Sequence, residues 1–108
     1  MNEFYKIKAL VKFLSKTEGG FRNAPLLAGY RPNFDFGGES FKDGIFSFDR
    51  NKMIYPGDEF ESDILFHDNR FFGKNFGKGS HFTFMEGRNK VGEGKVLEVI
   101  GLVSFHKE

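Results

Sequence analysis

The sequence predicts an all-β domain, either an antiparallel barrel or a sandwich of about six or seven strands. Short runs that alternate apolar and polar residues are separated by Gly-rich turn signals at fairly regular spacing. No segment carries a sustained helical period of 3.6 residues. The composition agrees, because the chain has 16 Phe and three Tyr, and aromatic residues favour strands.

The length indicates a single domain covering residues 1–108, with its core between about residues 5 and 103. Aromatic side chains bury a large area each, so a short chain can build a dense core from them. There are no cysteines, which excludes a disulfide framework, a thiolate metal site and a cysteine nucleophile.

The first predicted strand covers residues 5–13 and has a period of two. One face is apolar and consists of Tyr5, Ile7, Ala9, Val11 and Phe13. The other face carries Lys6, Lys8 and Lys12, with Leu10 between them. We therefore expect a strand that is buried on one side.

Later strands are predicted at residues 34–36, 45–48, 59–66, 81–86 and 95–105, with turns at 18–20, 37–40, 55–59, 73–79, 86–90 and 92–94. Pro56 and Gly57, followed by Asp58, form a strong tight-turn signal. The last strand is long and mostly apolar, which suits burial on both sides or a bend at Gly101.

No residue pattern indicates catalysis or a cofactor. The acidic residues Asp58, Glu59, Glu61 and Asp63 are interpreted as a solvated outer face, since the last three alternate along one strand. His67, His81 and His106 lack ligand spacing, and residues 73–80 do not match a phosphate-binding loop. We expect no enzyme activity and no bound metal, cofactor or nucleotide.

The chain lacks the marks of a secreted or membrane protein. Its first ten residues contain no signal-type apolar stretch, and the apolar run at residues 99–103 is too short to span a bilayer. We expect a soluble, cytoplasmic protein without a membrane partner. The formal net charge of +1 is not that of an obvious nucleic-acid binder, and no DNA binding is expected.

Basic residues nevertheless gather in or beside the Gly-rich loops. They are Arg22, Arg31, Lys74, Lys78, Arg88, Lys90 and Lys95. If loops at one barrel end bring them together, they can neutralise phosphates, with Phe21, Phe72 and Phe76 as stacking faces. Composition alone favours the plainer interpretation of solubilising charges and core aromatic residues.

Three separated segments resemble the third, C-terminal domain of the translation elongation factor Tu family. They are "LSKTEGG-FRNAPLLAGYRPNF" at 14–34, "YPGDEFESDILF" at 55–66 and "HFTFMEGRNKVGEGKVLEVIG" at 81–101. Their order and spacing match the family from about Ile7 to Gly101. The resemblance implies a six-stranded antiparallel β-barrel without catalytic residues.

In that family the domain packs on the GTPase and second domains, contacts the T-arm of tRNA and helps bind the nucleotide exchange factor. Arg22 matches a basic position of the family, whereas Asn23 and Ala24 replace its His and Thr. Arg31 matches the Arg of Tyr-Arg-Pro, and Arg88 and Lys90 keep basic character in the last loop.

Two binding functions follow as hypotheses. The first is a non-catalytic module that binds a protein partner, such as a translation factor or a protein that engages elongation factor Tu, as a mimic or decoy. Phe71, Phe72 and Phe76 either cap the barrel or form its interaction patch. The second is a tRNA-binding module that uses Arg22, Arg31, Lys74, Lys78, Arg88 and Lys90. The near-zero net charge and the altered loops favour a protein partner.

Overall fold

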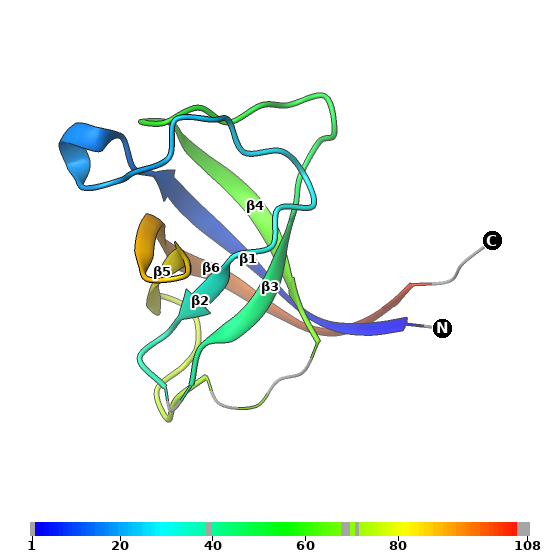
Figure 1. Cartoon of the computed structure of the whole chain (residues 1–108). Coiled ribbons are helices and arrows are strands. Elements are labelled where there is room, and N and C mark those ends of the chain that lie inside the picture. Colours follow the sequence, from blue (N-terminus) through cyan, green and yellow to red (C-terminus); the bar gives the residue numbers. More distant parts are fainter. Residues whose placement is uncertain (1, 39, 68–69, 71, 106–108) are drawn as a thin grey trace.

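The computed structural model, which describes residues 2–38, 40–67, 70 and 72–105, is a closed antiparallel β-barrel (Figure 1). Around the barrel the strands follow the order β1-β4-β3-β2-β5-β6. Their bounds are Asn2–Phe13 for β1, Asn33–Asp35 for β2, Lys42–Ser47 for β3, Glu59–Phe66 for β4, His81–Glu86 for β5 and Asn89–Phe105 for β6. A short 3-10 helix, η1, covers Lys16–Glu18. The predicted all-β barrel is confirmed.

Strand β1 closes the barrel, since it pairs with β4 on one side and with β6 on the other. The predicted faces of this strand are confirmed. Ile7, Ala9, Val11 and Phe13 are fully buried, and Tyr5 packs against them while partly exposed. The outer face places Lys8 opposite Asp63 and Lys12 opposite Glu59 on β4. Opposite charges on neighbouring strands therefore line this part of the surface.

The barrel interior is filled mainly by phenylalanine rings. Phe34 on β2 is the centre of the cluster, and its ring lies 5.3–5.9 Å from four other rings, those of Phe46, Phe66, Phe82 and Phe84. These separations suit tilted and edge-to-face aromatic pairs. Such bulky rings need space, and Gly44 on β3 supplies it, because a Cβ there would lie 2.6 Å from the Phe34 ring and 2.7 Å from the Phe66 ring.

The turn predicted at residues 92–94 is wrong, because these residues lie inside β6. Gly92 packs beneath the Phe84 ring and against the Lys12 carbonyl oxygen, so a Cβ would overlap both. Gly94 stands in the same relation to the Phe82 ring and to the Leu10 carbonyl oxygen. Here glycine makes room for a ring and a neighbouring strand rather than for a turn. The hairpin turn between β5 and β6 consists only of Gly87 and Arg88.

The Pro-Gly turn between β3 and β4 is confirmed. The Asp58 N–H donates to the Tyr55 carbonyl at 2.9 Å, and Gly57 has a φ of 97°, as the third residue of a type II turn requires. Strands β4 and β5 have the bounds that their alternation predicts, whereas β1 and β3 begin three residues earlier than expected.

The strand registers divide the loops between two ends of the barrel. The pairs Lys12 with Glu59 and Glu86 with Asn89 mark one end, which also carries η1 and is called the η1 end below. Tyr5 with Phe66 and His81 with Lys95 lie toward the other, called the far end. In Figure 1 η1 and the β5–β6 turn lie on one side of the molecule, and the start of β1 and the end of β6 lie on the opposite side. Among the described residues, no helix has the length and apolarity needed to cross a bilayer.

We expect Gly92→Ala to lower the free energy of unfolding by about 1–3 kcal/mol, because the methyl group would force the Phe84 ring and β1 apart. The midpoint of thermal unfolding, followed by circular dichroism, should fall by roughly 5–20 °C. Gly77→Ala is the matched control, since a Cβ there meets no atom within 4 Å. Equal midpoints for the two variants would contradict this account of the core.

Candidate functional site

The six basic residues predicted to contact RNA do not form one surface. Arg22, Arg88 and Lys90 lie toward the η1 end, whereas Lys74 and Lys78 lie in the β4–β5 connection at the far end. Arg31 lies beside β3, and its guanidinium is 3.3 Å from the Nε2 atom of His67. The barrel thus separates charges that the sequence suggested as one group.

Arg22 is held by the barrel. Its guanidinium forms a 2.6 Å ion pair with Glu86 at the end of β5 and lies over the Tyr30 ring, 5.0 Å from the centroid. Both charged side chains are about 30% exposed. Arg22 therefore acts mainly as a clamp between the loop after η1 and β5, because Glu86, the Ala24 carbonyl and the Tyr30 ring already engage its guanidinium.

The Tyr30 hydroxyl completes this cluster. Its oxygen is buried and has no hydrogen-bond partner among the described residues. Burial is the main reason that the pKa of Tyr30 is raised well above its ordinary value, and the nearby Glu86 carboxylate adds to the rise while Arg22 opposes it. The hydroxyl lies near Glu86 without the geometry of a hydrogen bond to it. Because the pKa is raised, the fold favours the neutral phenol over the phenolate.

The other residues predicted to contact RNA differ in ion pairing and exposure. Lys90 forms a 3.1 Å ion pair with Glu93 on the same strand. Arg88, Lys74 and Lys78 are exposed. Lys74 and Lys78 border an open depression of about 500 Å³. Its other polar lining residues are Asn75, Ser80 and His81.

The predicted aromatic interaction patch lies at the far end, and Phe71 falls outside the described residues. Phe72 is 5% exposed and belongs to the core, with the Lys42 ammonium 5.0 Å from its ring centroid. Phe76 stacks on Phe72 at 4.3 Å and packs against the core. Of the two expected roles, these two rings take the first and cap the barrel.

The acidic residues occupy the outer face that the sequence predicted for them. Glu59 and Glu61 are exposed, and Asp63 pairs with Lys6 at 3.2 Å. His67 and His81 are exposed too, while His106 lies outside the described residues. The described part of the chain holds no group of three His, Cys, Asp or Glu side chains placed to bind a metal ion.

A surface that sequence reasoning missed lies in the loops near the η1 end. Leu26 and Ile54 form an isolated antiparallel bridge with hydrogen bonds of 2.7 and 3.0 Å, and both side chains are buried. Alternation then turns their neighbours outward. These are Leu27, Met53 and Tyr55, which are 51%, 48% and 50% exposed and are called the end patch below. The Tyr55 hydroxyl lies 3.7 Å from the Met53 sulfur.

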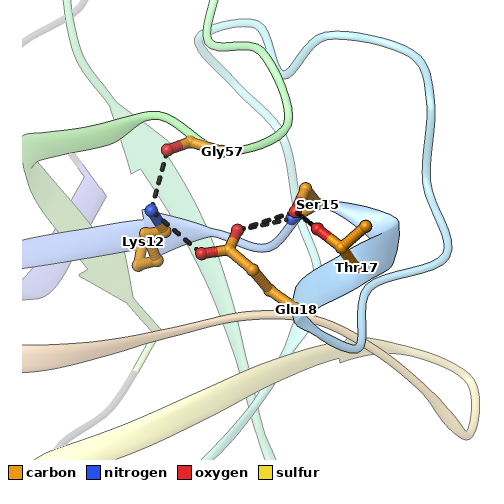
Figure 2. Close-up of polar contacts among 5 residues, drawn as sticks. All are labelled: Lys12, Ser15, Thr17, Glu18 and Gly57. Carbon is orange, nitrogen blue, oxygen red and sulfur yellow. Dashed lines mark hydrogen bonds and ion pairs between the residues drawn. The ribbon is translucent and has the colours of Figure 1, made fainter.

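A polar latch between Lys12, Glu18 and Gly57 ties the loop that carries Met53 and Tyr55 to β1 and η1 (Figure 2). The Lys12 ammonium donates to the Gly57 carbonyl at 2.8 Å and lies 3.3 Å from the Glu18 carboxylate. Glu18 also accepts hydrogen bonds from the Ser15 backbone N–H at 3.0 Å and from its hydroxyl at 2.9 Å. The Ser15 donors, together with Lys12, lower the pKa of Glu18.

The sequence contains a weak signal for the end patch. Leu26 and Leu27 are adjacent apolar residues in a loop, and Met53, Ile54 and Tyr55 precede the Pro-Gly turn. Each run is too short to show a period, so neither indicates which side chain is buried. Only the bridge between the two loops shows which side chains face outward. No protein-family model matches the chain.

We expect Tyr30→Phe to leave the free energy of unfolding at pH 7 unchanged or up to about 1 kcal/mol higher, because it removes a buried hydroxyl without a partner. The pKa of Tyr30 is raised in the folded state, so as the pH rises above about 10 this side chain ionises first in the unfolded chain. That ionisation favours unfolding, and the wild-type protein loses stability there. The variant lacks this loss.

Urea denaturation of both proteins at pH 7 and pH 11 measures the effect. The difference in unfolding free energy should shift in favour of Tyr30→Phe at the higher pH. A cost of about 1 kcal/mol at pH 7 would instead show that the hydroxyl donates a hydrogen bond to Glu86 in solution.

Proposed function

We propose that this chain is a non-catalytic module that binds a protein partner, and that the end patch is its contact surface. The observation that carries the proposal is the gathering of three half-exposed large apolar side chains, Leu27, Met53 and Tyr55, from two separate loops. Contiguous exposed apolar groups cost solvation free energy in a monomer and mark interaction surfaces.

The end patch rests on buried and hydrogen-bonded residues, which favours specific binding. The buried Leu26–Ile54 bridge lies directly under it, and the Lys12–Glu18–Gly57 latch ties the second loop to β1. A surface that is already ordered loses little conformational entropy on binding. Tyr and Met are both enriched in protein interfaces, and Tyr is also enriched among the residues that dominate their binding energy.

The class of partner follows from the resemblance to the third domain of elongation factor Tu. A barrel of that type presents a surface to proteins that recognise the factor, or to the factor's other domains. We therefore propose a partner within translation, either the factor's nucleotide exchange factor or the factor itself, with the chain acting as a mimic or decoy.

Exchanging Leu27 and Tyr55 for serine together should weaken partner binding by at least about 30-fold, equivalent to about 2 kcal/mol, because both outward apolar contacts are lost. Isothermal titration calorimetry with the purified exchange factor, and separately with elongation factor Tu, measures the change. Phe41→Ser is the matched control, since Phe41 is 55% exposed but precedes β3 at the far end. Absence of binding to both proteins would refute the proposed partner class.

A tRNA-binding function is the second candidate, and the depression beside Lys74 and Lys78 is the observation that favours it. Fluorescent tRNA titrated across a salt series tests it. Tight binding that falls steeply with salt, is lost in Lys74→Ala with Lys78→Ala and survives the end-patch change would favour RNA over a protein partner. Arg88→Ala with Lys90→Ala examines the η1 end in the same assay.

A further inference from the structure

Within the part of the chain that the structure describes, one edge of strand β6 is unpaired at the far end of the barrel. Pairing with β5 stops at Lys95, and Val96 adds hydrogen bonds of 2.8 Å with Gly79 and with Ser80. Past this point no residue in the described ranges pairs with that side of β6. The other side stays paired with β1 as far as Phe105.

Residues 2–6 and 101–105 pair as a ribbon that runs away from the barrel in Figure 1. Strand β4 still pairs with Tyr5 and Lys6, so residues 2–4 and 103–105 form the two-stranded outer part of this ribbon. Its register is continuous from Asn2 opposite Phe105 to Lys6 opposite Gly101. Two-stranded ribbons are marginally stable by themselves, and further strands stabilise them.

Only the outer part of this edge is regular. The β1–β6 register shifts between Lys6 and Ile7 and again between Lys8 and Ala9, so β6 carries extra residues there. Such bulges twist an edge and hinder pairing. The five residues from Gly101 to Phe105 lie beyond both shifts, and because Gly101 has a φ of 98°, residues 102–105 form the regular part of this unpaired edge.

The part of the edge beyond the bulges lacks the charged residues and prolines that often prevent strands from pairing. Residues 99–105 read VIGLVSF, without a charge or a proline. Leu102, at 62%, is the most exposed large apolar side chain among the described residues. An uncharged, apolar strand edge with free backbone donors and acceptors accepts another extended strand.

We propose that the occupant of this edge is the same edge of a second copy of the chain. Antiparallel pairing about a two-fold axis at Val103 places Leu102 opposite Ser104 of the partner copy and brings Phe105 opposite Gly101 at each end. A two-fold axis would bring like charges together across a charged edge. The electrostatics of this edge suit a copy of itself, since none of its five residues is charged.

This dimer is independent of the proposed function, because the ribbon and the end patch lie at opposite ends of the barrel. Both end patches remain exposed in the dimer. A partner with two binding surfaces would meet two linked sites and bind with increased avidity.

Sedimentation equilibrium of the full chain over a concentration series tests the dimer. The wild-type protein should approach twice the 12.4 kDa mass of one chain at high concentration. Leu102→Lys should reduce dimer affinity at least about 10-fold, because it places two lysines within the paired edge. This side chain is exposed in the monomer, so the barrel should still fold, which circular dichroism checks.

Leu27→Lys is the matched control, since it adds the same charge at an exposed apolar residue of the end patch. Dimers that survive this change but not Leu102→Lys support the edge pairing. Dimers lost only with Leu27→Lys would assign self-association to the end patch and overturn the proposal. A wild-type chain that stays monomeric up to about 1 mM would overturn it as well.

Oxidative cross-linking gives a second measurement that does not depend on Leu102→Lys. The chain has no cysteine, so Val103→Cys introduces a single thiol. Directly opposed residues on antiparallel strands have Cα atoms about 4.5–5.5 Å apart, within reach of a disulfide. Under mild oxidation by copper phenanthroline, Val103→Cys should form dimers quickly, while Glu61→Cys on the exposed face of β4 should not. Equal rates would contradict pairing at Val103.

Discussion

Close contact between phenylalanine rings and glycine residues is the packing constraint on which this barrel depends. A small six-stranded barrel has little interior space, and the rings of Phe34, Phe66 and Phe84 occupy most of its centre. Gly44 and Gly92 allow those rings to approach the strand backbones. Protein interiors are packed to crystal-like density, so adding a single methyl group at such a site disturbs the packing of the whole cluster.

The same core organises the loops at the η1 end. Leu26 and Ile54 belong to the buried cluster although both lie outside the named strands. Burial of this pair joins the loop after η1 to the loop before β4, and the Lys12 latch ties the second of these loops to β1. The end patch is thus a consequence of core packing. Leu26 and Ile54 point into the core, so the side chains next to them in the sequence point outward.

Part of the surface charge of the described residues is neutralised by ion pairs. Lys6 pairs with Asp63, Lys12 with Glu18, Arg22 with Glu86 and Lys90 with Glu93. Exposed ion pairs of this kind contribute little to stability, but they lower the local field that attracts an anionic partner. This distribution, rather than the net charge of +1, is the stronger reason to prefer a protein partner over RNA.

The sequence by itself determined the fold class, the bounds of β4 and β5 and the turn at Pro56 and Gly57, because alternation and turn chemistry are local properties. Tertiary structure alone decided that Gly92 and Gly94 lie within a strand, since the reason is contact with rings and a strand distant in sequence. It also decided that Phe72 is buried while Leu27, Met53 and Tyr55 are exposed. Short apolar runs in loops have no period, so their burial depends on which distant segment they meet.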